Sequence, residues 1–506
     1  MHFRRKPEDD VHRENMTEKE IDSSSFLEEV EAHRLSLRGA KLTAAIAFVT
    51  GTGFTLFGYD QGVMSSLLTA KQFEKTFPQV IVDGEHRNHA TLQSLLVAIY
   101  EIGCLIGALS NLWIGDRLGR RRTIALGGII MIVGAILQAA SFSYAQILVA
   151  RVITGLGNGL NQTSTVPSYH AECSPAVRRG SLIMIEGSLI TFGITVAISG
   201  TAVDMYVRVD FPASKPLFTG YLKWLDFAFF WAQSSSVQWR APVAIQIVFA
   251  LIMVVAIGYS HLDGKLLLKA GRPAEAMAVI SALEDKPTSD VGVRQLYEGI
   301  RDAVIAEGGS SLDNEEGNPS KGKVSLKELF THGKTQNFRR VCLGIAIQCF
   351  QQITGINIIT YYATLLFERL QISDTKSRII AACNATEYLL ASFIAIFLID
   401  TVGRRKLMFF GSAGQAGTMI LLAILGSINN SAARIVSAVM LFVFNSFFAV
   451  GWLGMAWLYP AEVVGLRMRG PANALSTASN WTFNFLVVMI TGPAFENISW
   501  RTYISK

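Results

Sequence analysis

Charged side chains are scarce in this sequence. Asp, Glu, Lys and Arg make up only 17% of its 506 residues, whereas 50% are hydrophobic. Because soluble domains carry about 25% charged residues, this composition excludes an ordinary soluble protein and predicts a membrane protein. The formal net charge of +6 does not indicate a nucleic-acid partner, because the basic residues concentrate in short loops between apolar segments.

Cysteine is also rare. The chain has five cysteines, an odd number, and none lies at the spacing of a metal site, so neither a disulfide framework nor a metal centre is expected. No nucleophile beside a base and no phosphate-binding loop stands out either. We therefore expect no catalytic residues, no metal and no cofactor, and a protein that is not an enzyme.

Long apolar runs, by contrast, recur along almost the whole chain. Each is close to the roughly 20 residues that an α-helix needs to cross a bilayer. The first 40 residues are hydrophilic and charged, which excludes a cleaved signal peptide and predicts a cytoplasmic tail at 1–40. Eleven membrane-spanning helices are predicted, at residues 44–69, 90–114, 123–143, 146–168, 180–200, 241–259, 341–366, 379–400, 406–428, 434–459 and 470–492.

Two loop patterns occur twice in the chain. They are Asp-x-x-Gly-Arg-Arg at 116–121 and 400–405, and Ala-Glu followed by Arg-Gly at 171–180 and 461–470. This duplication predicts two homologous six-helix halves, 41–260 and 339–506, joined at 261–338 by a cytoplasmic linker with amphipathic helices. Parallel halves around a midplane site are the plan of major facilitator transporters. The predicted fold is therefore an all-α membrane protein with the major facilitator fold.

The repeated loops bring together acids and arginines, which suits a gate on the cytoplasmic side. Exposed ion pairs contribute only ~0.2–1 kcal/mol each, so they open and close at modest cost, and forked guanidinium groups can bridge between spans. Alternatively the arginines only fix the topology, but this does not explain the acids at repeated spacing. The predicted gate residues are Asp116, Arg120, Arg121, Glu172, Arg179, Asp400, Arg404, Arg405, Glu462 and Arg469.

A few ionisable residues lie inside the apolar spans. Each one needs a reason, because an ionised side chain at the bilayer centre costs about 2.5–3.5 kcal/mol on insertion scales. We expect Asp60 and Arg151 to meet, since a nearby arginine would keep the aspartate ionised until a proton and the solute arrive. This is the chemistry of proton coupling. The alternative is a permanent ion pair that only joins two spans, and Glu101, Glu186 and Glu387 receive no role.

Amides and aromatic rings gather in the second half. Gln351, Gln352 and Asn357 lie in one span, and amide groups both donate and accept hydrogen bonds, which matches the hydroxyl groups of a sugar. Trp457 and Trp481 are placed to cover the apolar faces of a sugar ring. The sequence therefore predicts an amide-lined solute site with aromatic walls.

Four motifs carry a resemblance to a known family. They are Gly-Tyr-Asp-Gln-Gly-Val at 58–63, Gly-Asp-Arg-Leu-Gly-Arg-Arg at 115–121, Arg-Val-Ile-Thr-Gly-Leu-Gly-Asn-Gly at 151–159 and Gln-Gln-Ile-Thr-Gly-Ile-Asn at 351–357. With them the chain resembles the sugar porter family of the major facilitator superfamily, in particular its fungal-type members. The resemblance implies sugar binding by Gln351, Gln352 and Asn357, positions near the sugar for Asn384, Trp457, Asn480 and Trp481, and proton coupling by Asp60 and Arg151.

The chain departs from the family pattern at several places. Gly187 stands where the family usually has a sugar-contacting glutamine, which leaves the choice of sugar open. A stretch at about 201–223 interrupts a family-like run, and we expect it to be a retained non-coding insert. The chain stops at Lys506, where a twelfth span would begin, so the twelfth helix is expected to be missing and the second half truncated.

These observations predict transmembrane transport of a sugar, by proton symport and by alternating access of two helical halves. The expected partners are the sugar, protons and the lipid bilayer, with no nucleic acid. The expected state is a monomer in the plasma membrane with a cytoplasmic N-terminus. Three alternatives stay open: facilitated sugar diffusion, a sugar sensor that does not transport, and an inactive truncated isoform.

Overall fold

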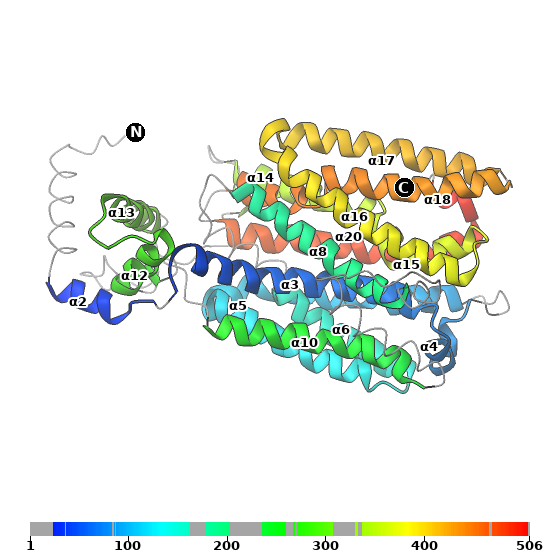
Figure 1. Cartoon of the computed structure of the whole chain (residues 1–506), viewed down its shortest axis with the longest axis horizontal. Helices are drawn as coiled ribbons and strands as arrows, with labels where there is room; N and C mark the ends of the chain where they lie inside the picture. The colour runs from blue at the N-terminus through cyan, green and yellow to red at the C-terminus, as the bar shows by residue number, and fades with distance from the viewer. Residues whose placement is uncertain are drawn as a thin grey trace, which may run out of the picture. The chain divides into compact units, whose positions relative to one another are not determined.

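The computed structural model describes residues 24–35, 37–82, 86, 88–161, 179–202, 235–259, 267–268, 271–306, 329–331, 336–428, 430–464 and 468–503. All regular elements within these residues are helices (Figure 1), as the sequence predicts. By their internal contacts the residues form two units. One comprises 1–47 with 260–325, and the other comprises 48–259 with 326–506.

The larger unit, residues 48–259 and 326–506, contains the long apolar helices. Its first half holds α3 (Gly39–Leu67) from residue 48 onward, α4 (Lys71–Thr76), η1 (Pro78–Val80), α5 (His89–Ala139), α6 (Tyr144–Asn161), α8 (Arg179–Ala202) and α10 (Val237–Tyr259). Its second half holds α14 (Asn337–Ile353), α15 (Ile356–Arg369), α16 (Asp374–Val402), α17 (Arg404–Ser427), α18 (Ser431–Gly451), α19 (Met455–Val463), α20 (Arg469–Asn497) and η7 (Ser499–Tyr503). The insert predicted at about 201–223 lies outside the described residues from residue 203 onward.

Each of the eleven ranges predicted to cross the membrane contains helix. α5 covers two of them, and its two parts meet at Gly119, whose φ of 74° lies in the left-handed region. Among the described residues, eight helices are long and apolar enough to cross a bilayer. The three remaining ranges contain α6, α8 and α20. α6 and α20 are more polar because they carry buried residues such as Arg151 and Asn480.

The larger unit buries polar side chains and exposes apolar ones. Phe397 is 76% exposed and Ile435 is 65% exposed, whereas Asp60, Glu101 and Arg151 are 0% exposed. An apolar outer surface is expected where lipid surrounds the helices, because lipid tails are as apolar as these side chains. Ionisable residues of membrane helices face the interior of the bundle, where they find partners. The groups that matter for function are therefore inside this bundle.

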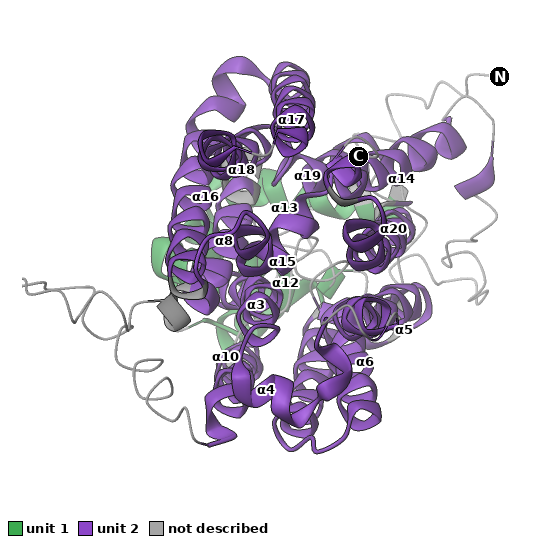
Figure 2. Cartoon of the chain, turned by 90° about the vertical axis from the view of Figure 1, so that its right-hand side faces the viewer, with its two compact units in different colours: residues 1–47, 260–325 green, residues 48–259, 326–506 purple. Residues whose placement is uncertain are grey.

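The two halves of the larger unit contact each other mainly through α5 with α20 and α8 with α16. Among the purple helices of Figure 2, α3, α8 and α15 lie toward the middle. Within the first half, Gly155 and Gly159 set the backbone of α6 against the backbone of α5 at Tyr100 and Cys104. A Cβ atom at either glycine would collide with that backbone, so these small residues fix how closely α5 and α6 approach.

The smaller unit, residues 1–47 and 260–325, contains α2 (Ser24–Ala32), α12 (Pro273–Glu284) and α13 (Val291–Ala306). α12 and α13 lie within the range predicted to be a linker with amphipathic helices, and α2 packs against α12. Arg38 donates hydrogen bonds to Ser281 Oγ at 2.9 Å and to the carbonyl oxygen of Lys286 at 3.2 Å. The residues just before α3 are therefore tied to the end of α12.

Candidate functional site

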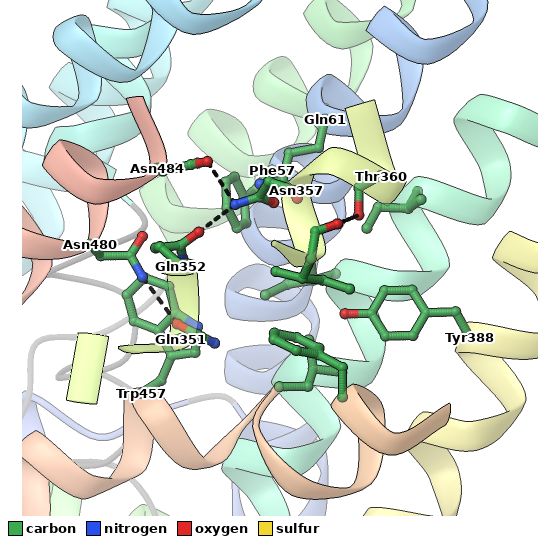
Figure 3. A pocket seen from close by; sticks show the side chains of 15 residues that line it. Phe57, Gln61, Gln351, Gln352, Asn357, Thr360, Tyr388, Trp457, Asn480 and Asn484 are labelled. Carbon is green, nitrogen blue, oxygen red and sulfur yellow. Dashed lines mark hydrogen bonds between the residues drawn. The ribbon is translucent and has the colours of Figure 1, made fainter. Parts of the chain in front are cut away.

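A cavity with about 430 Å³ of empty space lies between the two halves of the larger unit. The first half contributes side chains from α3 and α8, and the second half contributes the rest (Figure 3). The lining residues are Phe57, Gln61, Ile190, Ile194, Gln351, Gln352, Ile356, Asn357, Thr360, Tyr388, Phe448, Leu453, Trp457, Asn480 and Asn484.

A break between α14 and α15 places the polar side chains of the second half. α14 ends at Ile353 and α15 begins at Ile356, with Gly355 between them at a φ of 84°. This left-handed conformation suits glycine, which has no Cβ to clash. Because the break lies beside a cavity, the interrupted backbone stays away from lipid. It also aims Gln351, Gln352 and Asn357 at the same cavity.

The amides of the cavity form two hydrogen-bonded groups. Asn357 Nδ2 donates to Asn484 Oδ1 at 2.7 Å and also to Gln352 Oε1. Asn480 Nδ2 donates to Gln351 Oε1 at 3.0 Å, and Gln351 Nε2 donates to the carbonyl oxygen of Trp452 at 3.3 Å. These bonds hold the amides in place before any solute arrives, which lowers the ordering cost of binding.

These hydrogen bonds leave a polar group available to a ligand. Asn484 Nδ2 is buried and has no hydrogen-bond partner among the described residues. A buried donor without a partner is costly, typically by about 1–3 kcal/mol. A solute hydroxyl group bound in the cavity would therefore be stabilised by accepting a bond from Asn484.

Aromatic and apolar side chains form the other walls. Phe57 reaches the cavity from α3, and Phe448 from α18. Trp457 lies beside Gln351 in Figure 3, and the hydroxyl group of Tyr388 points toward the other labelled side chains. Such a mixture of flat apolar faces and fixed polar groups can hold a ring that carries hydroxyl groups.

The cavity carries no formal charge. None of the described residues that line it is an Asp, Glu, Lys, Arg or His. Burying an ionised solute beside neutral amides would cost far more than burying a neutral one, because a charge needs a charged or well-bonded partner. The arrangement therefore fits a neutral, polyhydroxylated molecule. Among the described residues, no group of three His, Cys, Asp or Glu side chains could hold a metal ion.

Five of the seven predicted solute-binding residues line the cavity, and two do not. Gln351, Gln352, Asn357, Trp457 and Asn480 belong to the lining. Asn384 lies off the cavity, where its Oδ1 accepts from Asn445 Nδ2 at 2.7 Å. Trp481 is fully buried behind the wall and packs edge-on against Phe57, with ring centroids 5.6 Å apart.

Sequence reasoning did not assign several lining residues. Phe57 and Gln61 lie near Asp60 on α3 and line the cavity, and Gln61 belongs to the same motif as Asp60. They received no role because the charged Asp60 was the stronger signal in that motif. Tyr388 lies in the middle of an apolar run on α16 and gives no separate signal. Gly187, which departs from the family pattern, lies next to Leu453, with its ideal Cβ position 3.3 Å from Leu453 Cγ. This position therefore borders the cavity.

The structure brings the predicted pair Asp60 and Arg151 together. Arg151 Nη1 donates to both carboxylate oxygens of Asp60 at 3.3 Å, and both side chains are 0% exposed. Arg151 Nη2 donates to the carbonyl oxygen of Val97 at 3.3 Å, and its guanidinium group lies 4.7 Å from the ring centroid of Tyr100. The pair lies entirely within the first half and does not line the cavity.

The predicted gate residues are described only in part. Arg404 Nη2 forms an ion pair with Glu462 Oε1 at 2.7 Å, and both side chains are about one third exposed. Arg121 donates to the carbonyl oxygen of Gly258, Arg405 lies over the ring of Phe409, and Asp400 is exposed. Glu172 and the side chains of Asp116, Arg120, Arg179 and Arg469 lie outside the described part of the chain.

Comparisons with known proteins agree with this architecture. The family described as "Sugar (and other) transporter" matches residues 45–505. The protein named Sugar transporter STL1 of Saccharomyces cerevisiae is 37% identical over 475 residues, which cover 92% of this chain and 76% of that protein. Hexose transporter 2 of Kluyveromyces lactis is 30% identical over 467 residues, covering 89% of this chain and 75% of that protein.

A solved structure shows the same fold. It is the major facilitator superfamily proton:xylose symporter XylE bound to 6-bromo-6-deoxy-D-glucose, with a TM-score of 0.70 over 92% of each chain. The sequence identity is 22%, so this likeness concerns the fold alone. The predicted all-α major facilitator fold is thereby confirmed.

Proposed function

Because the chain belongs to the family of sugar (and other) transporters, we propose that it carries a neutral sugar or similar polyhydroxylated solute across a membrane. Transport proceeds by alternating access, in which the two helical halves rock around a central site. The observation that carries this proposal is the uncharged, amide-lined cavity to which both halves contribute. The chain is a multi-pass membrane protein and a carrier, not an enzyme.

Binding of the solute relies on residues from both halves. Gln351, Gln352, Asn357 and Asn480 bond to its hydroxyl groups, while Trp457 covers an apolar face of the ring. A solute that touches α3 and α8 as well as α14 and α20 favours the conformation in which the halves approach each other. Binding energy is thereby converted into a shift between conformations, which is what alternating access requires.

Several hydrogen bonds between the halves close the space on one side of the site. Tyr362 donates from α15 to Ser94 Oγ on α5 at 3.3 Å. Arg378 Nη2 on α16 donates to the carbonyl oxygen of Thr69, just after α3, at 2.6 Å. These hydrogen bonds are few and each contributes little free energy, so they can break when the halves separate and form again when the halves close.

We also propose that transport is coupled to protons through Asp60 and Arg151. Phe57 and Gln61 line the cavity from the same helix turn that carries Asp60, so α3 connects the ion pair to the solute. Protonation of Asp60 would release Arg151 and free this helix to move. An ion pair with both side chains 0% exposed contributes little net stability, because its desolvation cost offsets much of its attraction, and this favours a role beyond joining two helices.

The finer cellular setting is part of the same proposal. The repeated basic loops argue for a cytoplasmic N-terminus and a cytoplasmic gate that includes the Arg404–Glu462 pair. Together with the gate arginines that the structure does not describe, this pair would hold the cytoplasmic side closed until the halves rock. We propose a monomer in the plasma membrane, because the two halves that line the cavity belong to the same chain.

Uptake into proteoliposomes that contain the purified chain tests the function. A panel of labelled sugars and polyols is offered with and without an inward proton gradient. We expect one class of neutral solute to accumulate when the gradient is present, and Asp60→Asn to equilibrate that solute without accumulation. Accumulation by Asp60→Asn would remove this residue from coupling. Equilibration by the wild type in every condition would indicate facilitated diffusion, and no uptake of any member would refute the transport proposal.

A further inference from the structure

Glu101 is a buried acid that the proposed mechanism has not used. It lies on α5 of the first half, is 0% exposed, and its Oε1 accepts a hydrogen bond from Tyr361 of the second half at 2.7 Å. Its Oε2 is buried and has no hydrogen-bond partner among the described residues. One carboxyl group therefore links the two halves and keeps one oxygen free.

The charges around Glu101 do not balance if every group is ionised. Arg151 on α6 and Asp60 on α3 are the charged groups near enough to act on Glu101. Arg151 places its Nη1 on Asp60 at 3.3 Å, whereas no ion pair joins it to Glu101 among the described residues. Two buried acids thus share one buried cation, and the cation is bound to Asp60. An unpaired buried carboxylate would be very costly, whereas a neutral carboxylic acid is far less so.

Within the part of the chain that the structure describes, no other element packed against α5 supplies a compensating charge. α20 packs against α5, but all its residues from Gly470 to Phe495 are uncharged. η1 is uncharged, and Arg240, the only charged residue of α10, is held at the carbonyl oxygen of Ser141. Tyr361 on α15 and Cys104 on α5 complete the titratable neighbours, together with Tyr100. All three are neutral at physiological pH.

We propose that Glu101 holds the coupling proton in this conformation and releases it only when Tyr361 leaves with the second half. This inference rests on the proposed proton-coupled transport and deepens it. When the halves part, water reaches the carboxyl group, the O–H bond of the protonated acid breaks, the electron pair stays on oxygen and the proton leaves to water. Arg151 Nε, which has no acceptor among the described residues, is then a free donor in the same cluster.

The contact between Tyr361 and Glu101 couples release of the proton to movement of the second half. Tyr361 is 0% exposed and lies on α15, next to Tyr362, which bonds to Ser94 of α5. Movement of α15 away from α5 therefore breaks both bonds together and opens Glu101 to water. Return of α15 shuts water out again, which favours the protonated acid. Glu101 is therefore protonated when this side of the site is closed and deprotonated when it is open.

Glu101→Gln in proteoliposomes tests the inference, because the amide mimics the protonated acid and keeps an oxygen that can accept from Tyr361. A proton gradient of about one pH unit drives about tenfold accumulation in a carrier that moves one proton per solute. We expect the wild type to accumulate solute and Glu101→Gln to reach only equal concentrations inside and outside. Solute exchange without a net proton flux should persist in Glu101→Gln, which shows that the variant is folded. Glu101→Asp should restore accumulation with a shifted pH profile.

The matched control is Glu387→Gln. Glu387 is partly buried rather than fully buried. Like Glu101, it has one oxygen bonded to a hydroxyl group, that of Ser446, and one oxygen without a partner among the described residues. It lies in the second half, and this variant should accumulate solute like the wild type. Wild-type accumulation by Glu101→Gln would overturn the inference while leaving the proposed function intact. Absence of accumulation in the wild type would overturn both.

A second measurement covers the case in which Glu101→Gln does not fold. Infrared difference spectra of the wild type between low and high pH should show the carbonyl band of a protonated carboxyl group. The band should persist in Glu387→Gln. Its absence from the wild type, or its loss in Glu387→Gln, would assign the proton elsewhere and refute the inference.

Discussion

Replacement of Asn357 by alanine tests the site at its centre. Asn357 is 5% exposed and donates to Asn484 Oδ1 at 2.7 Å and to Gln352 Oε1, so it joins the amides of three helix segments. One side-chain amide can make about two hydrogen bonds to a solute, and each contributes ~0.5–1.5 kcal/mol net. The loss of about 1–3 kcal/mol corresponds to a Kd for the transported solute that is roughly 5- to 150-fold higher.

The assay is equilibrium binding of the labelled solute to purified protein, with thermal unfolding measured in parallel. The matched control is Asn445→Ala, because Asn445 is 3% exposed and bonds to Asn384 at 2.7 Å but does not line the cavity. We expect Asn445→Ala to lower the unfolding temperature while the Kd stays at the wild-type value. The reasoning is refuted if Asn357→Ala binds like the wild type, or if both variants weaken binding equally.

Two further predictions concern the break before α15 and the exposed ion pair. Gly355→Ala should lower the free energy of unfolding by about 1–3 kcal/mol, because φ there is 84°. The control is Gly417→Ala, which should not destabilise the protein, because a Cβ at this helical position meets nothing within 4 Å. Equal unfolding temperatures for the two variants would contradict the strain argument. Arg404→Ala should remove ~0.2–1 kcal/mol from the closed cytoplasmic side and raise the inward-open population roughly 1.4- to 5-fold, measured as a distance distribution between spin labels on the two halves. Glu462→Gln should raise the inward-open population as much as Arg404→Ala does. If the effects of the two substitutions add up in the double variant, the ion pair at 2.7 Å does not stabilise the closed side.

The fold followed from the sequence because its signals are local or repeated. Apolar runs mark the helices, and the two copies of Asp-x-x-Gly-Arg-Arg mark the two halves. α6 and α20 were found as spans although they carry polar residues, since the rest of each run is apolar enough. The interruption at Gly355 was not predicted, because Thr354 and Gly355 lie in a run that reads as one continuous span. A single glycine in an apolar run is equally compatible with close helix packing.

Site residues could be proposed from the sequence only where they lie close together in the chain. Gln351, Gln352 and Asn357 were identified together, because they lie within one stretch beside the break. Asn384 was expected near the solute from the family resemblance, but it bonds to Asn445, which lies 61 residues further along the chain. Glu101 and Tyr361 are 260 residues apart, and no local pattern reveals such a contact. Contacts between residues this far apart in the chain can therefore be identified only in the three-dimensional structure.

The uncharged cavity has a consequence for the energetics of transport. A neutral solute in an uncharged site contributes nothing to electrical current, so under the proposed symport the only charge that crosses with it is that of the coupled proton. Each elementary charge that moves through 100 mV is worth about 2.3 kcal/mol, which corresponds to roughly 50-fold accumulation. Membrane voltage alone, without any difference in pH, is therefore sufficient to concentrate the solute.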